Sequence, residues 1–210
     1  ISKKDAMNKW GLFSANKYWS RISTAVDDTA NYIITYHEEP IDAVFHSTSS
    51  GRTENSEEVW ANAVPYLRSV ESEGEELSPK FTSKSDITLE EFKEKLINAK
   101  PGVKFDGDPG TYIEKEERTE GGSVKTIRIG GCDFKGTEIR KIFELNSANF
   151  TIEIDSQKES VTFHVKGNGH GVGMSQYGAN YLAQQGKTCE EILKHYYQGV
   201  DIIKIDLFEN

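Results

Sequence analysis

The sequence predicts an α+β fold built on antiparallel strands and hairpins with several short helices, and it leaves open whether the strands close into a barrel-like arrangement. Segments 149–155 and 161–165 alternate apolar and polar residues, which is the pattern of half-buried strands. Thr88 and Thr188 each stand three residues before a glutamate, the capping-box pattern that begins helices. The chain has 210 residues, of which 36% are hydrophobic, and this is enough to bury a core and argues against a disordered chain.

Charge and hydropathy exclude two classes of protein. The 25 basic and 34 acidic side chains give a net charge of −9, and no basic run is concentrated enough to predict binding to nucleic acid. No apolar run approaches the ~20 residues that a membrane-spanning helix needs. The two cysteines, Cys132 and Cys189, form no CxxC unit. They predict two separate buried thiols, although a disulfide between them stays open.

The first half of the chain predicts two helices, a hairpin and a surface segment. Ser23 and Thr24 are N-cap candidates for the first helix. β-Branched and aromatic residues favour strands on either side of the turn-rich stretch HEEP. The predicted elements are a helix at 20–31, strands at 33–36 and 41–45, an acidic surface segment at 71–86, and a helix between Thr88 and Lys100 with Leu89, Phe92 and Leu96 on its apolar face.

The second half predicts a less regular stretch followed by strands and C-terminal helices. Residues 102–123 are rich in glycine and predict a loop or an irregular hairpin. In the strand pair 149–155 and 161–165, alternation places the apolar residues of both strands on one face. The other predicted elements are a strand at 124–130, a short helix or turn at 136–145, a helix from about 174 to 186, a helix that follows the capping box of Thr188 and Glu191, and a strand at 200–208.

The segment 167–173, GNGHGVG, lies between a predicted strand and a predicted helix. Glycines let the backbone approach a ligand closely, and a helix start offers unpaired amide donors. This is not the dinucleotide fingerprint, because its third glycine would fall on Val172 or Met174, and no Gly-Lys-Ser/Thr follows. Two readings stay open: a tight connection whose glycines only relieve strain, or a ligand-binding loop that carries side chains suited to polyhydroxyl ligands, namely His170, Ser175 and Gln176.

Two histidines stand where predicted strands pass into polar loops. His46 and His170 are too few for a zinc site, and no HExxH or Cys/His cluster completes one. A triad of Ser47 with His170 and a carboxylate lacks the GxSxG elbow and is not predicted either. Residues that end neighbouring strands converge at one sheet edge. We therefore expect both imidazoles, within about 12 Å of each other and partly accessible, to line one cleft with Ser47 and Ser175 nearby.

Four segments occur in the order typical of one known family. They are HSTSSGRTENSEEVW (46–60), VPYLRSVES (64–72), GTEIRKIFELNSANFTI (136–152) and GNGHGVGMSQYGANYLAQQGKTCEEILKHYYQGVDI (167–202). These segments resemble the stage II sporulation protein D family, which includes the amidase-enhancer proteins. The resemblance covers essentially the whole chain and implies one domain, 1–210, with a less regular inserted region at about 71–135. Ser50 departs from the family pattern, which has a glycine there.

The resemblance implies lytic transglycosylation of peptidoglycan during sporulation. A carboxylic acid protonates the glycosidic oxygen between N-acetylmuramic acid and N-acetylglucosamine, and the muramic C6 hydroxyl then attacks to leave an anhydro end. In this family the acid is a glutamate in a Gly-Glu-Met-Pro segment, which is missing from these 210 residues. We therefore expect this chain alone to bind glycan weakly and not to cleave it. The alternative is a non-catalytic glycan-binding module or an amidase enhancer.

The resemblance also implies the site residues. Tyr66 is the candidate for a polar aromatic near the scissile bond, with a core tyrosine as the alternative. Glu54 is the candidate carboxylate within the chain and is expected to orient His46, with an exposed helix-start acid as the alternative. The implied substrate-binding residues are His46, Ser47, Thr48, Gly51, Gly169, His170, Gly171, Gly173, Ser175 and Gln176.

Cofactor, partners and location are likewise implied by the resemblance. No cofactor is expected to be required, and a zinc ion is left open, with most of its ligands upstream of this chain. The expected partners are peptidoglycan glycan strands and stage II sporulation protein P, an amidase and endopeptidase, and not nucleic acid. The full-length protein is expected outside the cytoplasm, held at the membrane by an N-terminal helix.

Overall fold

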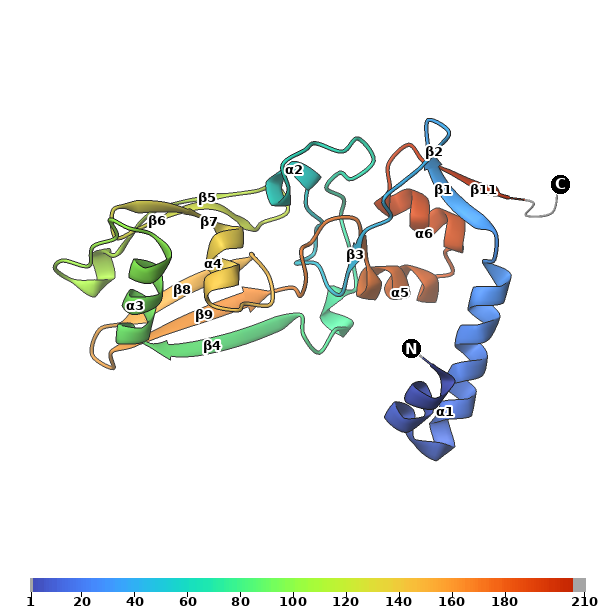
Figure 1. Ribbon diagram of the computed structural model, residues 1–210, viewed down its shortest axis with the longest axis horizontal. Helices are drawn as coiled ribbons and strands as arrows, with labels where there is room; N and C mark the ends of the chain where they lie inside the picture. The colour runs from blue at the N-terminus through green and yellow to red at the C-terminus, as the bar shows by residue number, and fades with distance from the viewer. Residues whose placement is uncertain (1, 206–210) are drawn as a thin grey trace. The chain divides into compact units, whose positions relative to one another are not determined.

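The computed structural model describes residues 2–205 (Figure 1). These residues form two compact units. One unit comprises the described residues up to Ile41 together with those from Asp201 onward, and the other is Asp42–Val200. The fold is mixed, with antiparallel sheets and several helices, as the sequence predicts. The described strands form four small separate sheets and do not close into a barrel. No helix in this part of the chain is long and apolar enough to cross a membrane.

The first unit contains a long helix and a small sheet. Helix α1 (Lys3–Asp28) begins at Ser2, whose side chain forms a capping box with Asp5, and it bends at Gly11. The sequence-based start at Ser23 or Thr24 is therefore wrong, because both residues lie inside this helix. The sheet has the order β11-β1-β2 and consists of β1 (Tyr32–Tyr36), β2 (Glu39–Pro40) and β11 (Asp201–Lys204).

The predicted hairpin after α1 is only partly confirmed. β1 pairs with β2 through Thr35 and Tyr36, but the predicted second strand, 41–45, does not continue the pair. The Ile41 N–H adds one further bond across the pair, to the Ile34 carbonyl at 3.0 Å, but residues 42–44 are not in a strand. The longer partner of β1 is β11, antiparallel over four residue pairs. The predicted last strand is confirmed for 201–204, while residues 206–208 lie outside the described part of the chain.

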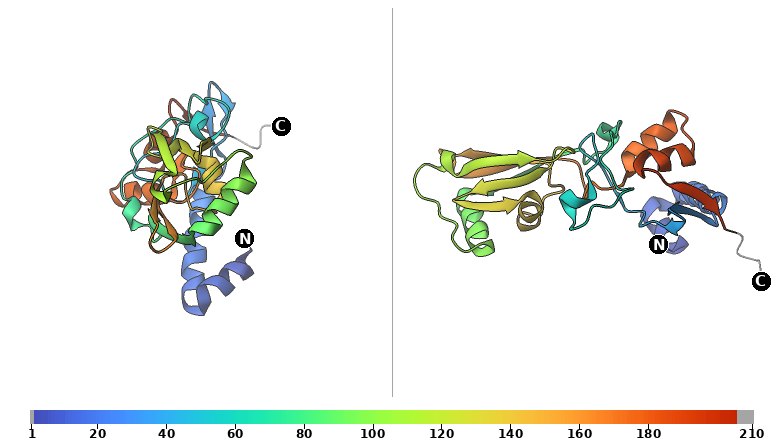
Figure 2. Two further views of the ribbon diagram at one scale, coloured as in Figure 1. Left: turned by 90° about the vertical axis from the view of Figure 1, so that its left-hand side faces the viewer. Right: turned by 90° about the horizontal axis from the view of Figure 1, so that it is seen from above.

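The second unit holds the hydrophobic core between two three-stranded sheets, with the orders β4-β9-β8 and β5-β6-β7. Helix α3 packs against β4 and β9, and α4 packs against β6 and β7 (Figures 1 and 2). The elements are β4 (Thr82–Thr88), α3 (Leu89–Ala99), β5 (Ile113–Arg118), β6 (Val124–Ile129), β7 (Cys132–Lys135), α4 (Gly136–Ile142), β8 (Phe150–Asp155) and β9 (Ser160–Lys166).

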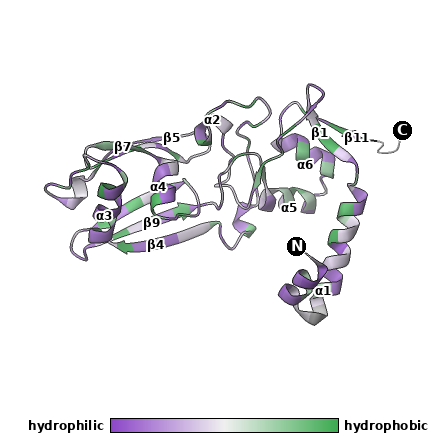
Figure 3. Ribbon diagram, in the orientation of Figure 1, coloured by the Kyte–Doolittle hydropathy of each residue, from purple (hydrophilic) through white to green (hydrophobic). Residues whose placement is uncertain are grey.

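The core confirms the local patterns of the sequence. Phe150 pairs with Val165, and the register continues through Ile152 with Phe163, so the apolar residues share one face as predicted. Phe92 on α3 is fully buried, and its ring stacks on Phe143, 5.5 Å between centroids. The alternation of apolar and polar residues along these strands is visible in Figure 3. The opposite face of the β4-β9-β8 sheet carries polar side chains.

Two stretches are more regular than the sequence suggested. The predicted surface segment 71–86 contains a short 3-10 helix, η1 (Glu75–Leu77), and the start of β4. The glycine-rich stretch 102–123 contains η2 (Pro109–Thr111) and β5. Both cysteines are free, as predicted, but the prediction that they are buried is wrong, because Cys132 is partly exposed and Cys189 is exposed.

The rest of the second unit carries short elements around the glycine-rich segment. They are β3 (Phe45–His46), α2 (Ser56–Val59), β10 (Met174–Ser175), α5 (Gln176–Gln184) and α6 (Cys189–Tyr196). The capping box of Thr188 and Glu191 begins α6, as predicted. Strands β3 and β10 pair in parallel, and their paired residues are 129 positions apart in the sequence. This pairing brings the segment after Val44 beside the glycine-rich segment. This pairing builds the candidate site.

Candidate functional site

The glycine-rich segment 167–175 runs between two other segments and bonds to both. On one side, the Thr48 N–H donates to the Asn168 carbonyl at 3.0 Å, and the Asn168 N–H donates back at 2.8 Å. On the other side, the Glu54 N–H donates to the Gly171 carbonyl at 2.8 Å. The segment is thus fixed on both sides by backbone hydrogen bonds. His46, Glu54 and His170 are held together by this arrangement.

The two histidines lie side by side, as the sequence predicts. Their ring centroids are 5.6 Å apart, edge to face. Nε2 of His170 lies 3.0 Å from the Phe45 carbonyl, and its Nδ1 accepts the Val172 N–H at 3.2 Å. A carbonyl only accepts, so Nε2 carries the proton and His170 is neutral with both nitrogens engaged. The His170 ring thus links the glycine-rich segment to β3 by hydrogen bonds, and neither of its nitrogens is free to transfer a proton.

His46 differs from the prediction in one respect. It is only 3% exposed, so the expectation that both imidazoles are accessible is wrong for this ring. Its Nδ1 lies 3.2 Å from the Val172 carbonyl, which places the proton on Nδ1. Its Nε2 is buried without a hydrogen-bond partner among the described residues. Burial and the neighbouring His170 lower the pKa of His46 to about 4, against an opposing effect of the Val172 carbonyl.

Glu54 is buried, with one oxygen unused. The residue is 3% exposed, which excludes the exposed-acid alternative. The expectation that Glu54 orients His46 is also wrong, because His46 Nδ1 bonds to the Val172 carbonyl and His46 Nε2 has no partner among the described residues. Its Oε1 accepts the Ser123 N–H at 3.2 Å, whereas Oε2 has no partner within the described chain. Glu54 lines a small cavity of about 20 Å³ together with His170 and Gly171. A cavity of this size holds one water molecule or one small polar group of a ligand.

Gly171 and Gly173 are required for different reasons. Both have positive φ, 82° and 72°, where a side chain is strained. A Cβ on Gly173 would lie 2.2 Å from the Val44 carbonyl oxygen, so this glycine allows the backbone to pass. A Cβ on Gly171 would lie 3.0 Å from Cγ of Glu54, so this glycine makes room for the carboxylate side chain. The glycines are therefore needed for close packing at both positions, and the ligand-binding interpretation of the segment stays a prediction.

Trp60 completes the site and was not predicted. Its ring centroid lies 5.3 Å from that of His170, and the residue is 42% exposed. An aromatic side chain that is packed on one face and open on another offers a flat apolar surface to a ligand. The sequence contains a signal for it, because Trp60 follows the short helix α2 in the conspicuous segment 46–60, but its side-chain direction is not visible in the pattern.

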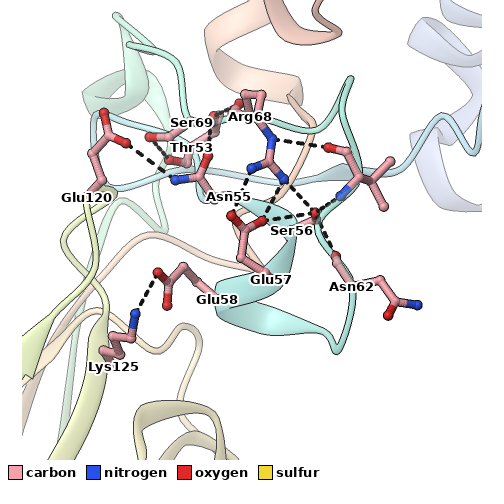
Figure 4. A network of polar contacts seen from close by, with 11 residues as sticks. Thr53, Asn55, Ser56, Glu57, Glu58, Asn62, Arg68, Ser69, Glu120 and Lys125 are labelled. Carbon is pink, nitrogen blue, oxygen red and sulfur yellow. Dashed lines mark hydrogen bonds and ion pairs between the residues drawn. The ribbon is translucent and has the colours of Figure 1, made fainter. Parts of the chain in front are cut away.

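The loop that carries Glu54 and Trp60 is held by a network of polar contacts (Figure 4). Arg68 binds both oxygens of Glu57, at 2.8 and 2.6 Å, and also donates to Ser56 Oγ at 2.8 Å. The bidentate contact to Arg68 lowers the pKa of Glu57 to about 2. Asn55 accepts the Ser69 N–H at 2.9 Å. The loop is thereby fixed by its own side chains.

A second buried carboxylate, that of Glu75, holds the segment next to the site. Glu75 is 1% exposed and accepts hydrogen bonds from the N–H and the hydroxyl of Ser49, at 3.0 and 2.9 Å, and from Ser72 at 2.6 Å. It anchors the segment between His46 and Glu54. The acidic composition of 71–86 predicts a surface position for this residue, which is wrong for Glu75, although its neighbours Glu73 and Glu76 are exposed.

The structure places the other predicted site residues in two groups. Thr48 and Ser175 are buried and bonded internally, since Thr48 donates to Ser78 at 2.8 Å and Ser175 caps α5. The hydroxyl of Tyr66 accepts the Asp42 N–H at 3.1 Å. The predicted residues that keep partial or full exposure near the glycine-rich segment are Ser47, Gly51, Gly169, His170, Gly171 and Gln176.

No metal centre is formed by the described residues. Among residues 2–205, no three His, Cys, Asp or Glu side chains gather as ligands. Both nitrogens of His170 are engaged, so the histidine pair offers one free nitrogen, on His46. These residues do not fit a zinc site by themselves. A zinc ion with most of its ligands outside this chain stays a prediction.

The depressed pKa of His46 predicts a pH-dependent stability. The folded-state pKa of about 4 lies below the ordinary value of 6.5, so the unfolded chain binds the proton more readily. Stability is therefore full above about pH 6.5 and falls by up to about 3 kcal/mol as the pH drops to about 4. Urea unfolding across this range should show the loss in the native chain and a smaller loss in His46→Asn. The exposed His164→Gln is the control, and an equal loss in all three proteins would contradict the assignment.

Comparison with known proteins relates the whole chain to one family. No family model matches. The chain is 43% identical over 209 residues to stage II sporulation protein D of Bacillus subtilis, and 44% identical over 207 residues to that of Bacillus amyloliquefaciens. These alignments cover 100% and 99% of this chain and 58% of each relative.

A more distant relative is the amidase enhancer of Bacillus subtilis. The chain is 26% identical to it over 248 residues, which cover 94% of this chain and 34% of that protein. The stronger similarities extend over the whole chain and include the segments that build the site. Over its whole length this chain is similar to the stage II sporulation protein D of two Bacillus species, and it spans 58% of the length of these relatives.

Proposed function

We propose that this chain supplies the glycan-binding cleft of a peptidoglycan lytic transglycosylase that acts in sporulation. The observation that carries the proposal is the unused Oε2 of buried Glu54, in a small cavity walled by glycine and by His170, which itself packs against the exposed Trp60. The family relation supports the connection with sporulation, since both Bacillus relatives are stage II sporulation proteins.

This arrangement suits the chemistry of an N-acetylated sugar. A sugar ring has an apolar face of C–H groups, which Trp60 accommodates, and it carries O–H and N–H donors at its edge. An unpaired carboxylate oxygen buried from water is a strong acceptor for such a donor. The cavity of about 20 Å³ admits one small group and not a whole ring. We therefore place an acetamido N–H or a hydroxyl of the glycan at Glu54 and the adjoining ring at Trp60.

The proposed reaction divides its tasks between this chain and the remainder of the longer protein. A carboxylic acid protonates the glycosidic oxygen, and the C6 hydroxyl of the muramic sugar closes the anhydro ring, so that no water molecule is consumed. This chain holds the sugars on either side of the bond. The acid is proposed to come from the part of the protein outside this chain. Glu54 and Tyr66 remain candidates for contacts near the scissile bond. Glu54 is the stronger candidate, because its buried Oε2 has no partner among the described residues.

Partners and location belong to the same proposal. The substrate is a glycan strand of peptidoglycan, and the proposed protein partner is stage II sporulation protein P, which removes peptides from such strands. The site of action is outside the cytoplasm, where this glycan is found. The net charge of −9 supports a partner other than nucleic acid.

A second candidate function is an amidase enhancer without its own lytic activity. The similarity to the amidase enhancer of Bacillus subtilis favours it, at 26% identity over 94% of this chain. The cavity at Glu54 and the exposed Trp60 would serve this function equally, because glycan is bound in both cases. The two candidates differ in whether anhydro ends are produced.

Digestion of purified sacculi separates these candidates. We expect this chain alone to release no anhydro-muropeptides, and a longer protein that includes the upstream glutamate segment to release them, as read by mass spectrometry. Release by neither protein, with stimulation of an added amidase, would favour the enhancer. Robust release by this chain alone that is lost in Glu54→Gln would show that Glu54 is the catalytic acid and that the division of tasks is wrong.

Two glycines give a matched test of the binding site. Gly171 and Gly186 have similar positive φ, 82° and 87°, so alanine costs about the same at both, on the order of 1–2 kcal/mol. Only at residue 171 does the added Cβ meet Glu54, since nothing lies within 4 Å at residue 186. Gly171→Ala should weaken binding to glycan strands about tenfold, equivalent to about 1.4 kcal/mol, and Gly186→Ala should leave it unchanged. If calorimetric titration shows equal affinities of the two variants for glycan, Gly171 only connects the strand to the helix and does not shape a binding site.

A further inference from the structure

A groove on the polar face of the β4-β9-β8 sheet adjoins the proposed glycan site. It has a volume of about 570 Å³, within the range of small-ligand sites. Asn149 and Lys166 line both this groove and the small cavity at Glu54. A ligand that reaches Glu54 can therefore continue over the sheet without leaving the surface.

The titratable side chains that line this groove are all basic. They are Lys84, His164 and Lys166, and no carboxylate is among the lining residues. Asp86 lies 3.1 Å from the Lys84 ammonium, and Glu153 lies 3.2 Å from His164. Lys166 makes no ion pair with any described residue, and its ammonium lies 5.3 Å from the centre of the Phe81 ring. Lys166 is therefore the uncompensated cation of the groove.

The position of Lys166 is fixed by its backbone. Its N–H donates to the Asn149 carbonyl at 2.8 Å, and its carbonyl accepts the Ser147 hydroxyl at 2.6 Å. The contact with Phe81 further limits the side chain, as a cation over an aromatic face is attracted to it. The ammonium is thus held at the border between the groove and the cavity.

We infer that Lys166 binds a carboxylate carried by the glycan, which makes the groove a subsite for anionic strands. This inference rests on the proposed glycan-binding function. The small cavity is lined by Glu54, Arg52 and Lys166, and Arg52 is already paired with Glu120 at 2.6 Å. The buried carboxylate of Glu54 repels an anion, so the anionic substituent lies on the groove side, at the unpaired Lys166. Muramic acid carries such a group on its lactyl arm, either free or continued by a peptide with carboxylates of its own. A strand of N-acetylglucosamine alone carries none.

The test compares two glycans of equal length in calorimetric titrations: alternating muramic strands with free lactyl carboxylates, and neutral N-acetylglucosamine oligomers. Lys166→Met keeps the apolar stem and removes the charge. It should weaken binding of the muramic strand about fivefold and leave the neutral oligomer unchanged. Lys158→Met, at the opposite end of the same hairpin and 80% exposed, is the matched control and should change neither affinity.

Each outcome decides the inference. An equal loss for both glycans in Lys166→Met, or no loss for either, would overturn the carboxylate site while leaving glycan binding intact. Failure of the native chain to bind either glycan would instead contradict the proposed function, and the subsite with it. A third titration, with peptide-bearing muramic strands, identifies the source of the carboxylate. A larger effect of Lys166→Met on these strands assigns it to the peptide, and a larger effect on the free strands assigns it to the lactyl arm.

Discussion

The site depends on the passage of one glycine-rich backbone between two polar segments. Val44 packs so closely on Gly173 that a Cβ would overlap its carbonyl oxygen, whereas a Cβ on Gly171 would lie 3.0 Å from Cγ of Glu54. Because the backbone fits, its hydrogen bonds to Thr48 and Glu54 form on both sides. Those bonds bring together side chains from distant parts of the sequence. The two histidines meet as a consequence, and Glu54 is buried with one oxygen free.

The parts of the fold that the sequence predicts are those set by local patterns. Alternation in 149–155 and 161–165 defines the β8–β9 pair and its buried face, since side chains of a strand point alternately to its two sides. The caps at Thr88 and Thr188 mark the starts of α3 and α6, because their hydroxyls satisfy amides within the same few residues. The convergence of His46 and His170 is likewise confirmed. The two residues meet because His46 ends β3 and His170 lies in the segment that leads into β10, the strand that pairs with β3.

What the sequence does not reveal depends on contacts between distant residues. Phe45 and His46 pair with a strand near residue 174, not with the neighbouring hairpin. Glu75 is buried because Ser49 and Ser72 surround it with donors, while an acidic run by itself predicts a solvated surface. Trp60 lies against His170 because the Arg68 network fixes its loop (Figure 4). None of these three arrangements has a signature within a short window of sequence.

The central claim is that a glycan strand binds at the Glu54 cavity and at Trp60. Two-dimensional nitrogen–proton NMR of the chain, titrated with an N-acetylglucosamine oligomer, tests it directly. The indole N–H signal of Trp60 and the amide signals of Gly169 and Gly171 should shift in a saturable way, while the amide of Gly186 stays in place. Saturable shifts confined to α3 and the β5-β6-β7 sheet, or no shifts at any oligomer concentration, would contradict the assignment of this site to glycan.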